Sequence, residues 1–296
     1  MTFSQKFRKI ILKNRNYKAV ILPDNGFKIA SFVYLPRNFE LFFQPPALKN
    51  SKYEDVYKKA SVGDDFSIYD TSGCDDCIPT IDPCYVIGVK NRLNDHGDVW
   101  SVKWNVLEEK EDAVSASVRL SSMPLRLTRK VILTNFGMRL QYRLLNEGDV
   151  KCPWMWTLHD LARYETDAVL KLSHPFKIFN AQNDDIRNFD IRDMKEVPEN
   201  GTYKFYYKAP VGKGTASILY PSQKMRYTLI FDNERFPYFG VWITTGGFKG
   251  EKNIAMEPSN GFYDSLERAI RNNKCEWLEP GEKTEWSVEI LLTPTN

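Results

Sequence analysis

Apolar and polar residues alternate with a period of two along much of this chain. The clearest example is the segment 138–144, where four apolar or aromatic residues alternate strictly with three polar ones. Such alternation places one buried and one wet face on a strand, as is typical of antiparallel sheets. Similar β-rich patterns predict strands in the segments 18–22, 28–35, 114–120, 125–131, 203–207, 227–231 and 286–292. The apolar face of 125–131 carries one charge, Arg129.

Turn and helix signals complete this pattern. The run Pro23-Asp24-Asn25-Gly26 separates two strand segments and predicts a hairpin turn. Helical signals are limited to 51–60 and to 264–273, where Leu266, Ala269 and Ile270 are spaced for one helix face. No helical block alternates with the strands, which disfavours a parallel βαβ fold. We therefore predict an all-β protein, one large antiparallel sandwich domain over residues 1–296, with 180–201 as a long surface insertion.

Composition supports this class and argues against several partners. The chain has 296 residues, 42% of them hydrophobic, and 41 basic against 38 acidic side chains give a net charge of +3. A nucleic-acid-binding protein usually carries a strongly basic domain or stripe, so nucleic acid is not expected as a partner. The aromatic fraction of 14% is high. Aromatic residues favour strands and also provide flat faces for sugars, although core packing is the commoner role.

The chain shows no targeting or membrane signal. No run approaches the roughly 18 apolar residues of a membrane span, and charged residues bracket the short apolar run at 10–12. We expect a cytoplasmic protein, monomeric or homodimeric, with free thiols on its five cysteines. Cys74 and Cys77 form a C-x-x-C, but no second ligand pair follows, and Pro79 and Pro83 discourage the helix of a redox motif. No metal and no cofactor are therefore expected.

Three histidines are candidates for chemistry. His96 lies between two aspartates and beside Gly97, which predicts a turn; the competing interpretation is an ordinary surface histidine. His159 lies in an apolar and aromatic segment, where the usual alternative is a core histidine hydrogen-bonded to the backbone. His174 precedes Pro175 at the end of a polar strand, and we expect it at the surface.

Glu257 stands out among the acids. It ends the apolar run 254–256 and directly precedes Pro258 and a turn. Burial there would raise the pKa of the carboxyl from about 4.3 toward the range useful for a general base. The competing interpretation is an ordinary glutamate on an edge strand.

A glutamate and histidines suit the interconversion of the two anomers of a sugar. A base removes the proton of the anomeric hydroxyl while an acid protonates the ring oxygen, and the opened aldehyde rotates before the ring closes. Glutamate and histidine can fill these roles near neutral pH without a metal or redox cofactor. From the residues alone, this reaction is one option among several.

Five short motifs, in order along nearly the whole chain, resemble the galactose mutarotase-like superfamily, the aldose 1-epimerases. The segment 22–32 is similar to the family's opening hairpin, and 73–81 to the loop before its first histidine. His96-Gly97 with Trp104 downstream resembles its His-Gly motif, and 153–159 its second-histidine strand. The last motif combines 256–258 with the C-terminal segments 278–282 and 286–292.

The resemblance implies a β-supersandwich that binds a pyranose in an open cleft, with a small-molecule sugar as partner. Glu257 would be the general base at the anomeric hydroxyl, and His159 the general acid at the ring oxygen. His96 would hydrogen-bond the sugar and help to polarise it. The implied class is an isomerase acting on carbohydrate.

Departures from the family concern the substrate. Relatives that act on hexose 6-phosphates carry one arginine in a Gly-Gly-x-Pro loop and another four residues after the first histidine. Here the loop reads 74–79 without arginine, and the second position is Trp100. The possible substitutes are Arg92, Arg126 and Lys103. The arginine upstream of the first histidine in galactose mutarotases also has no clear equivalent, and Asp232 is the nearest candidate for their substrate-binding aspartate. A neutral pyranose therefore fits best, and the residues that would single out galactose are not evident in the sequence.

Further residues are candidates for holding the sugar. Asp75 and Asp76 could accept hydrogen bonds from sugar hydroxyls, although a solvated turn is the competing interpretation. Trp242, one predicted strand before Glu257, could stack on the sugar ring, or pack in the core.

Three other functions remain open. The chain could be a carbohydrate-binding or sensing protein on the same fold, without turnover. It could be a hexose-6-phosphate 1-epimerase, despite the missing arginines. It could also resemble the sandwich subdomains that accompany polysaccharide lyases and hydrolases, although no catalytic helical domain is evident in the sequence.

Overall fold

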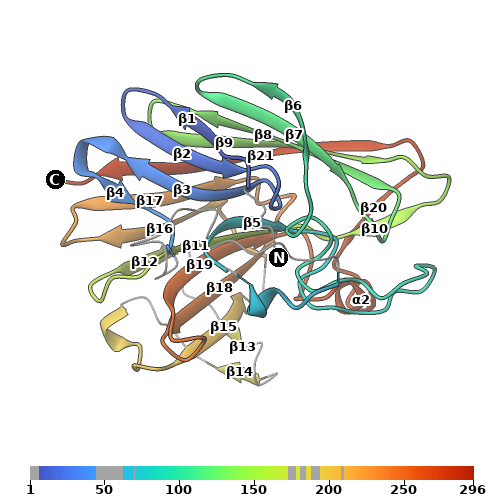
Figure 1. Ribbon diagram of the computed structural model, residues 1–296. Helices are drawn as coiled ribbons and strands as arrows, with labels where there is room; N and C mark the ends of the chain where they lie inside the picture. Colours follow the sequence, from blue (N-terminus) through green and yellow to red (C-terminus); the bar gives the residue numbers. More distant parts are fainter. Residues whose placement is uncertain are drawn as a thin grey trace, which may run out of the picture.

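The computed structural model describes residues 7–44, 63–69, 71–172, 178–180, 185–187, 194–207 and 210–296. The strands of two large antiparallel sheets form the bulk of the molecule (Figure 1). The predicted all-β antiparallel sandwich is therefore confirmed.

The larger sheet has eleven strands and carries the residues of greatest interest. Its strands, in spatial order, are β1 (Ile10–Lys13), β2 (Tyr17–Leu22), β3 (Lys28–Tyr34), β5 (Gly73–Cys77), β11 (Thr157–Arg163), β19 (Lys252–Ser259), β18 (Tyr238–Thr245), β15 (Thr202–Tyr207), β13 (Ile178–Asn180) and β14 (Asp185–Arg187), with β4 (Phe39–Glu40) paired to β3. Neighbours in this order often lie far apart in the sequence, so the sheet brings distant segments together.

The second sheet has eight strands. In spatial order they are β12 (Val169–Leu172), β16 (Thr215–Tyr220), β17 (Met225–Phe231), β21 (Lys283–Pro294), β9 (Gly137–Asn146), β8 (Leu125–Leu133), β7 (Ala113–Arg119) and β6 (Asn105–Glu109). A separate two-stranded sheet joins β10 (Cys152–Trp154) to β20 (Glu276–Leu278). The helices among the described residues are α2 (Leu266–Arg271) and three short 3₁₀ helices, Leu35–Arg37, Phe66–Ile68 and Met194–Glu196.

Every strand predicted from alternation is present. Successive side chains of a strand point to opposite faces, so alternation of apolar and polar residues indicates which face is buried. In β9 the residues 138, 140, 142 and 144 are buried, whereas 139, 141 and 143 are exposed. The predicted hairpin turn at 23–26 connects β2 to β3. The predicted helix at 264–273 is shorter than expected: it begins after Ser265, whose side chain accepts a hydrogen bond from the backbone N–H of Arg268 as an N-cap.

One expectation is corrected, one concerns a segment that is described in part, and two lie outside the described residues. The segment 73–77, predicted as a loop, forms the interior strand β5, because it pairs with β11 on one side and β3 on the other. The predicted surface insertion 180–201 contributes β14 to the edge of the larger sheet and the 3₁₀ helix Met194–Glu196. The predicted helix at 51–60 and His174 lie outside the described residues.

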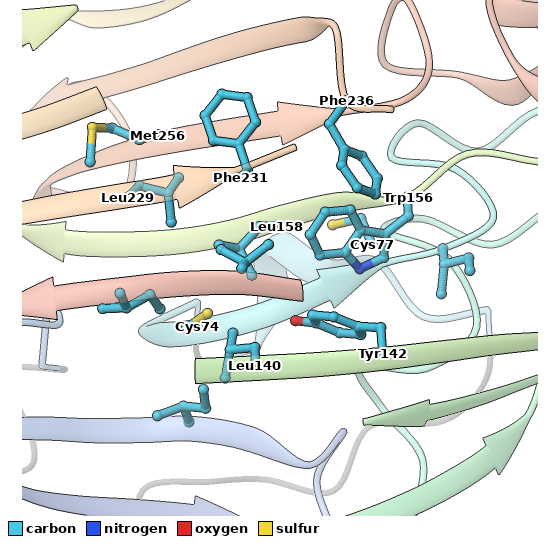
Figure 2. Close-up of a cluster of buried hydrophobic side chains, with 14 of the residues drawn as sticks. Cys74, Cys77, Leu140, Tyr142, Trp156, Leu158, Leu229, Phe231, Phe236 and Met256 are labelled. Atoms are coloured by element: carbon cyan, nitrogen blue, oxygen red, sulfur yellow. The ribbon is translucent and has the colours of Figure 1, made fainter. Parts of the chain in front are cut away.

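The core fills the space between the two sheets. Figure 2 draws part of this core, with side chains of β9 and β17 from the eight-stranded sheet and of β5, β11 and β19 from the eleven-stranded one; they include Leu140, Tyr142, Leu229, Phe231, Cys74, Leu158 and Met256. Trp156 and Phe236 join this cluster with ring centroids 4.9 Å apart. Many of the aromatic residues therefore pack in the core.

A buried ion pair crosses this core. Arg129 of β8, the one charge on its strand's apolar face, is fully buried, and its Nη1 lies 2.6 Å from Oδ2 of Asp76 on β5. The guanidinium also lies 4.8 Å from the ring centroid of Phe27. The other oxygen of Asp76 accepts hydrogen bonds from Tyr142 Oη at 2.9 Å and Trp156 Nε1 at 3.0 Å. These contacts satisfy a charge that would otherwise be costly to bury.

Candidate active site

A row of charged and titratable side chains crosses the larger sheet. His159 of β11 lies opposite Asp75 of β5 in the strand register. The partners Thr157↔Ser259 and Leu161↔Ala255 place Glu257 of β19 opposite His159 on the other side. Side chains at directly opposed positions share one face of an antiparallel sheet. The sheet therefore brings together a histidine and a glutamate that lie 98 positions apart in the sequence.

This face of the sheet forms the floor of a cavity of about 680 Å³. Strands contribute His159, Leu161, Lys204, Trp242, Asn253 and Glu257. The 3₁₀ helix Phe66–Ile68 contributes Phe66, and loops contribute Ile81, Asp82, Arg92, Asp95, His96, Glu251 and Asp264 among others. Among the predicted site residues, His96, His159, Glu257 and Trp242 all line this cavity. Its volume falls in the range of small-molecule sites.

His96 is held in the cavity wall by a tight turn. Its backbone has a positive φ of 54°, and Nδ1 lies 2.9 Å from Oδ1 of Asp95. Its ring stacks on Phe66 with centroids 4.1 Å apart and an interplanar angle of 13°. Because Asp95 engages Nδ1, Nε2 is the nitrogen that can reach a ligand. The predicted turn histidine is thus confirmed, and its ring is fixed on two sides.

Gly97 makes this turn possible. Its φ is 79°, and a Cβ at this position would lie 2.1 Å from the carbonyl oxygen of Ile78. We expect Gly97→Ala to lower the free energy of unfolding through both the left-handed backbone and this clash. Gly88→Ala is the matched control, because Gly88 has a φ of 86° and a Cβ there would have no neighbour within 4 Å.

Chemical denaturation of both variants separates the two effects. Gly97→Ala should cost about 1–3 kcal/mol more than Gly88→Ala, the usual scale of forced overpacking. Equal losses in the two variants would show that the close approach to Ile78 has no energetic consequence.

His159 is buried beside His96 and Glu257. The residue is 8% exposed, and its ring centroid lies 5.1 Å from that of His96 in an edge-to-face arrangement. Nδ1 is buried and has no hydrogen-bond partner among the described residues. A core histidine satisfied by the backbone is therefore the wrong interpretation. Burial lowers the pKa of His159 well below its usual value, and repulsion from His96, Lys204 and Lys28 lowers it further.

Glu257 is fully buried on an interior strand, between β11 and β18. The alternative of an edge-strand glutamate is therefore wrong. Burial raises the pKa of its carboxyl, and the neighbouring ammonium of Lys204 partly opposes this rise. Lys204 donates a hydrogen bond to Oε2, whereas Oε1 has no hydrogen-bond partner among the described residues and lies 3.9 Å from Nε2 of His159.

Sequence reasoning missed two residues of this site. Lys204 of β15 reaches Glu257, and its Nζ also lies 3.9 Å from Oδ1 of Asp264. Asp264 in turn accepts a hydrogen bond from the hydroxyl of Tyr206. The available signal was a single charge within the aromatic strand 203–207, which the strand interpretation alone does not explain.

Asp75 and Asp76 are not among the residues that line the cavity. Both lie on an interior strand rather than in a solvated loop. Because burial of an unpaired charge is costly, each forms an ion pair. Lys28 donates to Asp75, and both side chains are buried, at 1% and 2% exposure. Asp76 points the opposite way, into the core, and pairs with Arg129. The placement of Asp75 and Asp76 therefore does not support the predicted contacts with sugar hydroxyls.

The remaining candidates divide between two places. Trp242 lines the cavity, where its Nε1 donates to Oδ1 of Asn253 at 3.0 Å. Asp232 instead follows β17 and lines a separate groove on the eight-stranded sheet with Trp286. The prediction that Asp232 accompanies Glu257 at one site is not supported, because β17 belongs to the other sheet. Of the possible anion-binding side chains, Arg92 lines the cavity.

The C-x-x-C cysteines are buried free thiols, and the other three cysteines are free as well. Burial raises the pKa of both Cys74 and Cys77 well above the usual value, which keeps them protonated. Residues three apart on a strand point to opposite faces, so the two sulfurs do not face one site. Within the described ranges, no group of three or more His, Cys, Asp and Glu side chains is arranged to hold a metal ion.

The described residues contain no helix long and apolar enough to cross a membrane.

The chemistry available in the cavity is that of a carboxylate and two imidazoles. The carboxylate oxygen Oε1 of Glu257 and the imidazole Nε2 of His159 are too far apart for a direct hydrogen bond. Because both residues line the cavity, a ligand bound there can contact both groups.

Comparison with known proteins identifies the fold. No family model and no curated protein matches the chain. Among solved structures, the Slr1438 protein of Synechocystis sp. PCC 6803 matches with a TM-score of 0.79 at 14% identity, covering 99% of both chains. A galactose mutarotase-like protein from Lactobacillus casei ATCC 334 matches with a TM-score of 0.70 at 17% identity, covering 97% of this chain and 100% of its own.

A galactose mutarotase-like protein from Clostridium acetobutylicum gives a TM-score of 0.71 at 16% identity, covering 100% of this chain and 98% of its own. At these identities the likeness concerns the fold. The expected galactose mutarotase-like β-sandwich is thereby confirmed over almost the whole chain.

Proposed function

We propose that a chain with the galactose mutarotase-like fold and this cavity is an aldose 1-epimerase that acts on a neutral pyranose. The observation that carries the proposal is the approach of Glu257 Oε1 to His159 Nε2, 3.9 Å apart at the cavity floor. A buried carboxylate and an imidazole at this spacing can act on two oxygens of one sugar, the anomeric hydroxyl and the ring oxygen.

In the proposed reaction, Glu257 Oε1 accepts the proton of the anomeric hydroxyl while His159 donates a proton to the ring oxygen. The bond between the anomeric carbon and the ring oxygen breaks, which gives the open-chain aldehyde. Rotation of the aldehyde and return of both protons close the ring in the other anomeric form. His96, held by Asp95, would hydrogen-bond the sugar through Nε2.

Trp242 would provide an aromatic face for the ring within the same cavity. Its indole N–H is already engaged by Asn253, which fixes the plane of the side chain. Stacking of a sugar on such a fixed ring needs little further ordering of the protein.

The charges of the cavity favour a neutral sugar. Its acidic lining residues are Asp65, Asp82, Asp95, Glu251, Glu257 and Asp264, whereas its basic ones are Arg92 and Lys204. Lys204 is engaged by Glu257 and Asp264. A phosphate dianion would therefore be repelled, and Arg92 alone offers little compensation. A hexose 6-phosphate is accordingly the less favoured substrate.

NMR exchange spectroscopy on a panel of free aldoses tests the proposal, because it reports α/β interconversion directly. We expect the wild-type protein to accelerate exchange for at least one neutral aldose above the spontaneous rate. Hexose 6-phosphates belong in the same panel, since their preference over free sugars would contradict the neutral substrate.

The alternative of a non-catalytic carbohydrate-binding protein gives a different result in this experiment. Sugar resonances would broaden on addition of protein while the exchange rate stayed at its spontaneous value. Such an outcome would contradict the epimerase proposal.

The proposed mechanism also predicts a bell-shaped pH dependence of kcat/KM. The mechanism requires an ionised Glu257 together with a protonated His159, although burial raises the pKa of Glu257 and lowers that of His159. Activity should fall at low pH, where both groups are protonated, and at high pH, where neither is. The two apparent pKa values belong to the pair and not to either residue. A pH-independent rate would argue against this pair as the acid and base.

A further inference from the structure

We infer that Lys204 is the positioning residue of Glu257: it occupies one carboxylate oxygen, leaves the other for the sugar, and places a positive charge beside the buried carboxylate. This inference rests on the proposed function of the same cavity and adds a residue to it.

The geometry separates the two oxygens of Glu257. Lys204 Nζ donates to Oε2, whereas Oε1 is buried and has no hydrogen-bond partner among the described residues. Oε1 is also the oxygen nearest to Nε2 of His159. The carboxylate is thereby fixed in rotation, and a single oxygen is presented as the base.

The position of Lys204 follows from the sheet. Lys204 lies opposite Trp242, and Trp242 lies opposite Ala255, two residues before Glu257 on the same face. Between Glu257 and β15 stands Gly240, where a Cβ would lie 2.9 Å from Oε2 of Glu257. The absence of a side chain there leaves the space through which the lysine reaches the carboxylate.

Lys204 is well suited to remain charged. Its side chain is 12% exposed, and burial alone would lower the pKa of the ammonium. The charges of Glu257 and Asp264 outweigh this effect, so the pKa of Lys204 lies above its usual value. A permanently charged lysine at hydrogen-bonding distance favours the ionised form of Glu257, the form that a general base requires.

Removal of the charge of Lys204 should shift the pKa values of Glu257 and His159 in the same direction. The lysine lowers the pKa of Glu257 by attraction and that of His159 by repulsion. Without it both pKa values rise, so the whole bell-shaped pH profile should move to higher pH. The other titratable groups that adjoin Glu257 are His96, Asp82 and Asp264 around the cavity, Tyr206 on β15, Cys77 on β5, and Asp160 on the other face of β11; Lys28 on β3 also acts on His159. All of them remain in a Lys204 variant.

The test compares Lys204→Met, Lys204→Gln and Lys204→Arg. Met and Gln both remove the positive charge, but the amide of Gln still offers a hydrogen-bond donor. Arg keeps the positive charge. We expect Met and Gln to move the kcat/KM profile about 1–3 pH units upward, the usual effect of one neighbouring charge. On the acid limb of the wild-type profile, an upward shift of this size lowers kcat/KM about tenfold or more. Arg should leave the profile close to that of the wild type.

Lys130→Met is the matched control. Lys130 lies on β8 of the other sheet, where its Nζ lies 3.2 Å from Oε2 of Glu108, so the substitution removes a charge from another lysine–glutamate pair. Its profile should stay in place. Lower activity in Lys204→Gln with an unmoved pH profile would overturn the inference, because it would indicate a purely structural lysine.

A second measurement separates this inference from the proposed function. NMR titration of the imidazole of His159, assigned with His159→Asn, needs no sugar and no turnover. Its pKa should rise in Lys204→Gln and stay unchanged in Lys130→Met. A wild type that accelerates no aldose, together with this rise, would contradict the epimerase while retaining the electrostatic role of Lys204. An unchanged titration of His159 would overturn that role.

Discussion

Replacement of Glu257 by Gln should reduce anomer interconversion by about 100-fold or more, the usual scale for loss of a general base. Gln has nearly the shape of Glu, but its amide cannot accept the anomeric proton. In the wild type, Oε1 is free of hydrogen bonds from the described residues and faces His159 across 3.9 Å. NMR exchange spectroscopy on the best aldose of the panel measures the loss.

The control for this variant is Glu289→Gln. Glu289 lies on β21, where Oε1 accepts from Arg139 at 2.6 Å on the eight-stranded sheet. Its rate should match the wild type. Glu257→Gln should still broaden the resonances of the sugar, because the rest of the cavity is retained. A rate near that of the wild type would remove Glu257 from the mechanism.

Loss of the buried guanidinium should give the largest effect on stability. Arg129→Met should lower the free energy of unfolding by about 3–5 kcal/mol, because it leaves the carboxylate of Asp76 buried without its cation. Both side chains have 0% exposure, and the ion pair spans 2.6 Å. The variant also loses the contact of the guanidinium with the ring of Phe27. Urea denaturation measures the difference.

A neighbouring arginine provides the control for this effect. Arg126 lies on the same strand and its side chain is 33% exposed, with Nε 2.7 Å from Oε1 of Glu147. Arg126→Met should cost less than about 1 kcal/mol, as is typical of surface pairs. The double variant Arg129→Met/Asp76→Asn should recover part of the loss, since a neutral amide needs no counterion. A cost below about 1 kcal/mol for Arg129→Met alone would contradict the buried-pair argument.

The strands, and the three residues His96, His159 and Glu257 that line one cavity, could be predicted from the sequence. Alternation acts locally: the face of a strand on which a residue lies depends only on its neighbours, as in β9. The apolar run before Glu257 likewise predicted a buried carboxyl with a raised pKa. The cavity brings His96, His159 and Glu257 together, which is the arrangement that the sequence interpretation required.

Which side chains meet depends instead on how the strands are ordered in space. Lys204 reaches Glu257 because β15 lies one strand beyond β18, and no local pattern encodes this order. Asp75 and Asp76 are adjacent in the sequence, yet one faces the Lys28 side of the sheet and the other faces Arg129 in the core. Sheet pairing between distant segments sets these contacts, so the partners of each buried charge could not be predicted from sequence spacing.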